Sequence, residues 1–251
     1  TAPRLERLAR GGVLFPHHLA SSSLTPVSVS QMMTGRVAPP ILMSAHFRLA
    51  PVRAADDELL VLPRVLAARG YRTALVSAHP WFDEGARLIE DFESVRVIEP
   101  SEKTREKPYA WFEELLPAVR EELAAGAADP RPFFLYVHSM DTHEPFHVHD
   151  GFDDWVGGAG EPKYDAYDSE IAYTDDRVGA VLDEIERRGL AGETAFFFTS
   201  DHGEEFNEMG PTRADRNHGY TARRALVHVP LVARLPGHPA PGSRFAGTTR
   251  H

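Results

Sequence analysis

The residues best suited to chemistry form a short cluster, Ser200-Asp201-His202-Gly203-Glu204, directly after the apolar run Phe196-Phe197-Phe198. A carboxylate beside an imidazole offers ligands that suit Zn²⁺ or Mn²⁺. Gly203 permits the tight turn and close approach that such a site requires. An isolated Asp-His pair is more often a turn cap beside a surface histidine. The pair therefore predicts a metal site only if further groups converge on it.

Two more histidine clusters provide such groups. Asn217-His218-Gly219-Tyr220 precedes the apolar run 229–234, and its position would let a loop fold back over Asp201 and His202. The other cluster, 138–146, follows the apolar run 132–138. We expect His138 to be a strand-end residue satisfied by hydrogen bonds, whereas His143, in the loop beyond, is the better candidate for contacting a substrate.

Thr25 is the candidate nucleophile. Pro26 fits the first turn of a short helix and Gly35 fits its end, so Thr25 is predicted to be the N-cap. As a plain cap it would contribute about 1 kcal/mol and no chemistry. A helix N-terminus also carries unpaired N–H groups and positive potential, which would stabilise both an ionised hydroxyl and an anionic ester.

The elements that must position these groups can be read from periodicity. Short apolar runs bounded by turn formers predict buried strands at 72–77, 132–138, 195–200 and 229–234. Helical periodicity covers 57–69, 107–125 and 164–188, and Gly189 is placed to end the last helix. Alternating strands and helices predict an α/β fold around a mostly parallel sheet. Ligands gather at the carboxyl ends of such strands, where the clusters above occur.

Composition limits the partners. The chain of 251 residues is long enough for one large core, and we expect a single domain. Its formal net charge of −10 argues against nucleic acid, whose partners usually display a basic stripe. There is no cysteine, so disulfides and thiolate metal sites are excluded. No apolar run approaches the ~20 residues that cross a bilayer. We expect a soluble segment, and its compartment stays open between cytoplasm and periplasm or exterior.

The sequence resembles the sulfatase family, and through it the alkaline phosphatase superfamily, over almost its whole length. Segment 3–15 looks like the family's first helix. The other matching motifs are Thr34-Gly35-Arg36, Gly70-Tyr71-Arg72-Thr73, Asp141-Thr142-His143-Glu144-Pro145-Phe146, Ser200-Asp201-His202-Gly203-Glu204 and Val229-Pro230-Leu231-Val232. The resemblance implies a three-layer α/β/α sandwich. It also implies that 1–251 is a catalytic domain lacking the family's first metal-binding strand and its C-terminal part.

The resemblance also implies roles for single residues. Asp201, His202 and Thr25 would hold one divalent cation, with Mn²⁺ or Zn²⁺ favoured over Ca²⁺ because imidazole is a ligand. Thr25 would be the nucleophile, since it lies eleven positions before Arg36, where sulfatases carry the Cys or Ser that becomes formylglycine. His143 and His218 would bind the anion or assist the leaving group.

Threonine is not a precursor of formylglycine, and threonine-nucleophile relatives transfer phosphoryl groups. We therefore expect a hydrolase of phosphate or sulfate esters, with phosphoryl transfer through a covalent threonine intermediate favoured. The substrate would be a small-molecule or lipid-linked anionic ester. Two alternatives stay open. One is a phosphoglycerol or phosphoethanolamine transferase, and the other is a non-catalytic sulfatase-like binding module, which the replacement of the motif arginine by Val29 supports.

Overall fold

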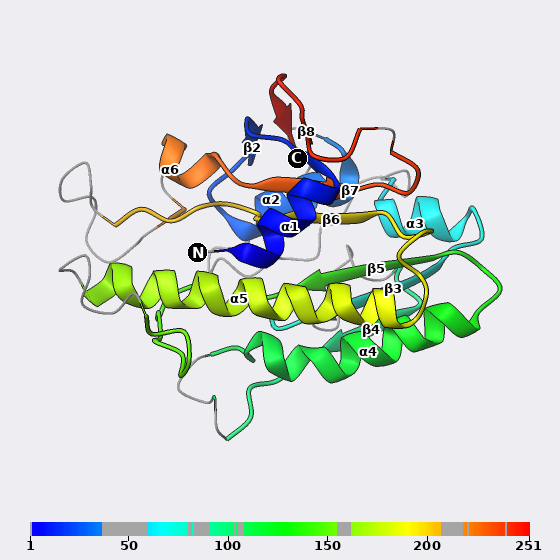
Figure 1. Cartoon of the computed structure of the whole chain (residues 1–251), viewed down its shortest axis with the longest axis horizontal. Coiled ribbons are helices and arrows are strands. Elements are labelled where there is room, and N and C mark those ends of the chain that lie inside the picture. Colours follow the sequence, from blue (N-terminus) through cyan, green and yellow to red (C-terminus); the bar gives the residue numbers. More distant parts are fainter. Residues whose placement is uncertain are drawn as a thin grey trace. The chain divides into compact units, whose positions relative to one another are not determined.

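The computed structural model describes residues 2–36, 60–79, 82, 91–102, 104, 108–154, 162–206, 218–219, 221–238 and 240–251. The chain divides into two compact units. Unit 1 comprises Thr1–Arg7, Leu66–Glu84 and Asp91–Thr194, and unit 2 comprises Leu8–Val65, Gly85–Glu90 and Ala195–His251. Helices α1 (Pro3–Gly11) and α3 (Leu62–Ala67) have residues in both (Figure 1). Each unit is described by itself.

Unit 1 contains a fully parallel sheet of order β4-β3-β5, made of Ser94–Val97, Arg72–Ser77 and Phe133–His138. The predicted strand 72–77 is confirmed at both ends, and the predicted strand 132–138 is confirmed to within one residue. The centre of β3 is fully buried, as expected for a strand covered on both faces. Helix α4 (Phe112–Ala128) packs against β3 and β5 and runs beside α5 (Figure 1).

Helix α5 (Pro162–Arg187) is the longest helix among the described residues. The sequence predicts an apolar stripe of Ile171, Val178, Leu182 and Ile185 on this helix; the last three are buried, whereas Ile171 is only partly buried. Gly189 has a φ of 72° just beyond the last turn, a left-handed conformation that favours glycine at this position. The polar residue Asp175 is also buried, because its carboxylate accepts hydrogen bonds from the first N–H groups of α1, those of Arg4 and Leu5, at 2.8 Å each.

Unit 2 contains a mixed sheet of order β6-β7-β1-β8, made of Phe196–Thr199, Leu231–Arg234, Val13–Leu14 and Ser243–Arg244. Pairing is antiparallel between β6 and β7 and between β7 and β1, and parallel between β1 and β8. A second, parallel pair joins β2 (His18–Leu19) to β9 (Thr249–Arg250). Helices α2 (Thr25–Thr34) and α6 (Arg224–Val227) complete the described part of this unit.

The predictions and the structure differ mainly in the shortest elements. Strands β1, β2, β8 and β9 have two residues each, too few for any periodicity to show in the sequence. The predicted helix 107–125 begins at Phe112 instead and continues to Ala128. The predicted helix 57–69 is shorter, at Leu62–Ala67, and its first three predicted residues lie outside the described ones.

Candidate active site

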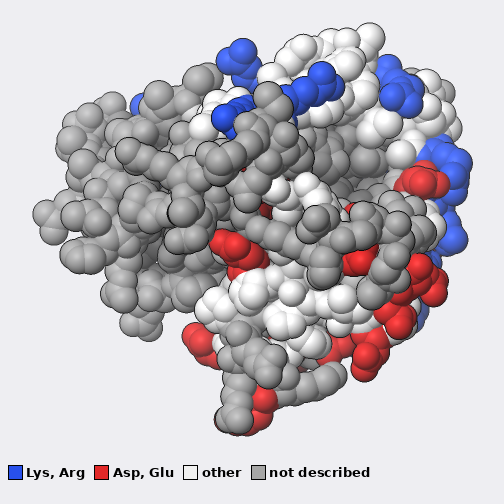
Figure 2. All heavy atoms as spheres, turned by 90° about the vertical axis from the view of Figure 1, so that its left-hand side faces the viewer, with Lys and Arg blue, Asp and Glu red and all other residues white. Residues whose placement is uncertain are grey.

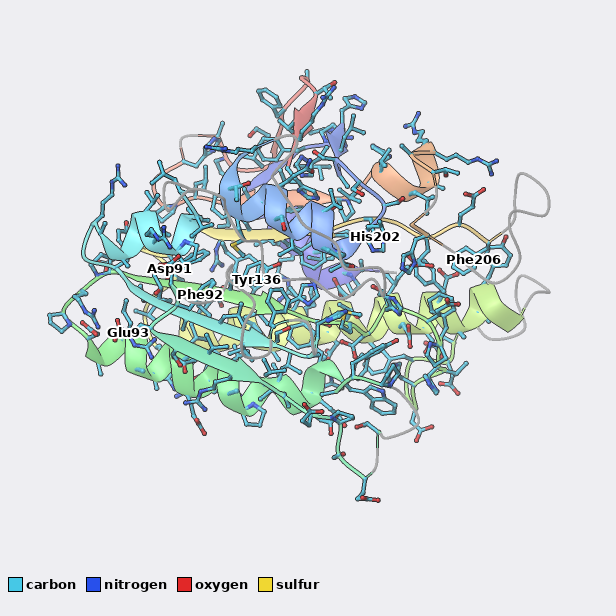
Figure 3. All side chains as sticks on the ribbon, turned by 180° about the vertical axis from the view of Figure 1, so that it is seen from behind. Asp91, Phe92, Glu93, Tyr136, His202 and Phe206 are labelled. Atoms are coloured by element: carbon cyan, nitrogen blue, oxygen red, sulfur yellow. The ribbon has the colours of Figure 1, made fainter. Side chains whose placement is uncertain are left out.

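Thr25 and His202 meet although 177 residues separate them in the sequence. Thr25 Oγ1 lies 3.1 Å from His202 Nε2, and both residues are buried. Figure 3 shows His202 beside α2, the helix that Thr25 begins. The prediction that Thr25 is the N-cap was wrong by one position: the cap is Leu24, whose carbonyl accepts the N–H groups of Val27 and Ser28. The Thr25 hydroxyl is therefore not used for capping and instead contacts His202.

Hydrogen bonding sets the protonation pattern of the His202 ring. Its Nδ1 lies 2.9 Å from the carbonyl oxygen of Gly203, which can only accept, so Nδ1 carries the proton. In the neutral ring, Nε2 then carries a lone pair directed toward the Thr25 hydroxyl. A metal-ligating histidine commonly donates its other N–H to a carbonyl in this way. His202 is thus oriented to accept either a proton or a cation at Nε2.

The end of β6 presents Asp201 next to this histidine. Asp201 Oδ1 accepts the backbone N–H of His202 at 3.0 Å, and Oδ2 lies 3.6 Å from His202 Nε2. Gly203 then passes so close to α6 that a Cβ atom there would lie 2.0 Å from the Ala225 carbonyl oxygen. The Gly203 N–H donates to the Leu226 carbonyl at 2.8 Å. Glycine is thus required here for close approach, as the sequence predicts.

Glu204 and His218 complete the cluster. Glu204 Oε1 lies 2.7 Å from His218 Nδ1, in the geometry of a charge contact rather than of an aligned hydrogen bond. The rings of His202 and His218 have their centroids 4.5 Å apart. One ligand atom from each of His202, Glu204 and His218 lies within 4.8 Å of the other two. The sequence places Glu204 in the 200–204 motif but does not by itself predict that it binds a metal.

The residues that flank His218 pack against the residues before Thr25. Gly219 has a φ of 89°, and a Cβ atom there would lie 2.8 Å from the Leu24 side chain. The Ser23 hydroxyl donates to the Thr221 carbonyl at 2.6 Å. The segment around His218 is thereby held against the residues that immediately precede Thr25. The prediction that this loop folds back to Asp201 and His202 agrees with these contacts.

The donor set fits a divalent cation. Two imidazoles and a carboxylate from His202, Glu204 and His218 are ligands that Zn²⁺ and Mn²⁺ accept, and Asp201 adds a second carboxylate beside His202. Glu204 Oε2 is buried and has no hydrogen-bond partner among the described residues. A buried carboxylate oxygen in that state is costly unless a cation or proton satisfies it.

His143 belongs to unit 1 and is hydrogen-bonded there. The Tyr109 hydroxyl donates to the carbonyl of His143 and lies 2.7 Å from that of Glu144. His143 Nδ1 donates to the Glu144 carbonyl at 2.7 Å, which leaves the lone pair of the neutral ring on Nε2. His138 is buried, with its ring centroid 5.2 Å from that of Phe82, consistent with the structural role expected for it.

Asp141, from the same motif as His143, is involved in folding. It is 1% exposed, and its Oδ1 accepts the N–H of Phe112, the first residue of α4, at 3.0 Å. Its Oδ2 accepts the Ser139 hydroxyl. The carboxylate therefore satisfies one of the unpaired donors at the start of a helix. This use distinguishes Asp141 from Asp201, which lies beside His202, the partner of the candidate nucleophile.

On the face in Figure 2, acidic and basic side chains both reach the surface. Across the described part of the chain, no helix combines the length and the apolar character needed to traverse a bilayer.

Comparisons with known proteins identify the family and the fold. A sequence profile named Sulfatase matches residues 1–251. The chain is similar to bovine (Bos taurus) arylsulfatase A, with 28% identity over 295 residues, covering 96% of this chain and 55% of that protein. The chain thus spans about half the length of this relative.

Solved structures show the same fold at low identity. The lipoteichoic acid synthase LtaP from Listeria monocytogenes aligns with a TM-score of 0.74 and 15% identity, over 99% of this chain and 62% of that one. A protein in the alkaline phosphatase superfamily from Vibrio parahaemolyticus aligns with a TM-score of 0.68 and 15% identity, over 97% of this chain and 56% of that one. The fold class is therefore that of the alkaline phosphatase superfamily, as predicted.

Proposed function

Because the chain belongs to the sulfatase family, we propose that the protein is a metal-dependent hydrolase of phosphate or sulfate esters in which Thr25 is the nucleophile. The observation that carries this proposal is the 3.1 Å contact between Thr25 Oγ1 and His202 Nε2, at the start of one helix and the end of one strand. A hydroxyl held by an imidazole and placed at the positive end of a helix is suited to attack an anionic ester.

The proposed cation ligands are Asp201, His202 and Thr25, and Glu204 and His218 lie close enough to contribute. When bound, a divalent cation would neutralise the ester's charge and favour ionisation of the Thr25 hydroxyl. Mn²⁺ and Zn²⁺ suit this mixed set of imidazole and carboxylate better than Ca²⁺ does, because Ca²⁺ prefers oxygen ligands alone.

The chain's own residues then have defined tasks in the proposed reaction. Thr25 Oγ1 forms a bond to phosphorus or sulfur while the bond from that atom to the leaving oxygen breaks, and the Thr25 proton passes to solvent. A protonated His143 or His218 gives a proton to the leaving oxygen. A water oxygen then displaces Thr25 Oγ1, which regains a proton from that water; a monoester substrate thereby releases inorganic phosphate or sulfate, and a phosphate diester releases a phosphate monoester.

Phosphate esters are the favoured substrates within this proposal. Threonine at the nucleophile position cannot be converted to the formylglycine of the true sulfatases, and Val29 replaces the arginine of the sulfatase motif. A transferase is the second candidate, supported by the fold shared with a protein named as a lipoteichoic acid synthase. The two differ in the acceptor that displaces Thr25, which is water in a hydrolase and a substrate hydroxyl in a transferase.

Substitution and chelation test the proposal together. Thr25→Ala should reduce hydrolysis of aryl phosphate mono- and diesters by at least about 10³-fold without unfolding the protein. Thr34→Ala, at the other end of α2, is the matched control and should remain active, since the Thr34 hydroxyl donates to the Ser30 carbonyl and accepts the Arg36 N–H, both at the end of the helix away from Thr25. EDTA should abolish turnover and Mn²⁺ or Zn²⁺ should restore it.

Each failure has its own meaning. Full activity in Thr25→Ala would refute the nucleophile. Absence of turnover on a panel of phosphate and sulfate esters, with and without added metal, would instead favour the non-catalytic binding module.

A further inference from the structure

A second pair of histidines, His18 and His251, contacts the backbone directly before Asp201. His18 is in β2 and His251 follows β9, and 233 residues separate them in the sequence. His18 Nε2 lies 3.2 Å from His251 Nδ1, and the rings meet edge to face with centroids 4.8 Å apart. His251 Nε2 lies 3.0 Å from the Ser200 carbonyl oxygen. The pair therefore ends at the residue directly before Asp201.

The direction of every hydrogen bond in this chain of groups is fixed by its last acceptor. The Ser200 carbonyl can only accept, so His251 Nε2 donates and the Nδ1 of the neutral ring accepts. His18 Nε2 must then donate to that Nδ1, which leaves His18 Nδ1 as an acceptor for the Thr249 hydroxyl at 2.8 Å. One arrangement of protons satisfies all four groups at once.

Burial keeps both rings in this neutral arrangement. His18 is 3% exposed, and burial together with the neighbouring His251 lowers the pKa of His18 to about 4. Burial also lowers the pKa of His251, against the opposing effect of the Ser200 carbonyl and of Asp201. At neutral pH the four groups thus form a continuous relay of hydrogen bonds.

The backbone around the relay is itself held in place. The N–H of His251 donates to the Leu19 carbonyl at 3.2 Å, and the N–H of Val229 donates to the His18 carbonyl at 3.1 Å. The same segment that leads into Val229 accepts the Gly203 N–H at Leu226. The loop that carries Asp201 and His202 is therefore fixed on one side through Gly203 and on the other through Ser200.

We propose that His251 is a positioning residue for the cation site. By donating a hydrogen bond that fixes the Ser200 carbonyl, it sets the direction in which the Asp201 carboxylate points just beyond the end of β6. This inference rests on the proposed function, since it assigns Asp201 to the cation. His18 and Thr249 act through His251 by fixing its tautomer and ring orientation. Partners of this kind commonly change metal affinity by about 10- to 100-fold.

Mn²⁺ binding to the purified protein, measured by isothermal titration calorimetry, tests the proposal without any assay of turnover. His251→Phe keeps a ring of similar size but loses both hydrogen bonds, and we expect Mn²⁺ affinity to fall about tenfold or more. His251→Gln retains a donor for Ser200 and an acceptor for His18, and its affinity should stay within about threefold of the wild type. Wild-type affinity in His251→Phe, or an equal loss in His251→Gln, would overturn the proposal.

Two further variants separate the causes of failure. Asp201→Asn should lose Mn²⁺ affinity strongly, and if it binds as the wild type does, the proposed cation site fails rather than the role of His251 alone. Thr249→Val removes only the donor to His18 and should weaken binding by about threefold. It replaces His251→Phe as the decisive variant if the latter does not fold, and wild-type affinity in Thr249→Val would then overturn the relay.

Discussion

Two buried glutamates, one in each unit, show how a structural carboxylate differs from a candidate ligand. Glu122 in α4 has a side chain 1% exposed, and both its oxygens are used. Oε2 accepts from Arg72 at 2.6 Å, and Oε1 accepts from Ser94 at 2.7 Å and from Arg96 at 2.8 Å. Glu204 is 5% exposed, yet only its Oε1 has a near neighbour, His218, and its Oε2 has no hydrogen-bond partner in the described part of the chain.

The difference lies in the balance of charge. Two guanidinium groups satisfy Glu122, so its burial serves the packing of α4 on the β3–β4 part of the sheet. Around Glu204 the described ligand atoms belong to two imidazoles, His202 and His218, and among the described residues no guanidinium group pairs with it there. A fully paired buried carboxylate indicates a structural role, whereas an underpaired one beside histidines indicates a place for a cation.

The largest effect should come from removing the charge of the structural glutamate. Glu122→Gln leaves Arg72, whose side chain is 13% exposed, with an uncompensated charge. We expect a loss of about 3–5 kcal/mol in the free energy of unfolding, measured by urea denaturation. Mn²⁺ affinity of the folded variant should not change. A stability within error of the wild type would show that the Glu122 network contributes little.

The matched change at Glu204 should weaken Mn²⁺ binding but leave the free energy of unfolding almost unchanged. Glu204→Gln should weaken Mn²⁺ binding by about 100-fold, because it removes a charged oxygen from the proposed ligand set. The free energy of unfolding of the metal-free protein should change by no more than about 1 kcal/mol, since no described donor is left unpaired. If stability falls while Mn²⁺ affinity is kept, the contrast between the two glutamates is wrong.

A smaller effect is expected in the pH dependence of stability. Burial alone would raise the pKa of Glu122, but hydrogen bonds from Ser94 and Arg72 and the charges of Arg72 and Arg96 outweigh it and lower the pKa. A lowered pKa means that the stabilisation is complete above the ordinary glutamate pKa of about 4.3 and is lost as pH falls through the folded value.

The slope from one such group is at most about 1.4 kcal/mol per pH unit. Urea denaturation from pH 5 downward should therefore show a shallower loss of stability in Glu122→Gln than in the wild type. Parallel curves for the two proteins would contradict the assignment.

The sequence predicted those parts of the fold that have enough residues to show a period. Strand β3 and helix α5 repeat their pattern over several turns or pleats, whereas two-residue strands such as β2 exist only because β9 and His228 pair with it from distant parts of the chain. The N-cap assignment of Thr25 failed because local capping preference does not reveal that a distant imidazole contacts the hydroxyl.

Only those residues of the candidate site that lie in recognisable motifs could be predicted from the sequence. Asp201, His202 and His218 lie in recognisable motifs, and Gly203 indicates close approach. In the sequence Glu204 cannot be told from a surface glutamate, and only the fold brings His218 to it. His251 had no signal at all, because its role depends on His18 across the length of the chain. Residues that act through long-range contacts leave no local pattern.

The most direct measurement is mass spectrometry of the protein quenched during turnover of a phosphate ester with a good leaving group. The account predicts a phosphoryl group on the peptide that contains Thr25, assigned to that side chain by fragmentation and absent from Thr25→Ala. A label on any other residue, or turnover without any label on Thr25 under conditions that trap acid-stable phosphothreonine, would contradict the account.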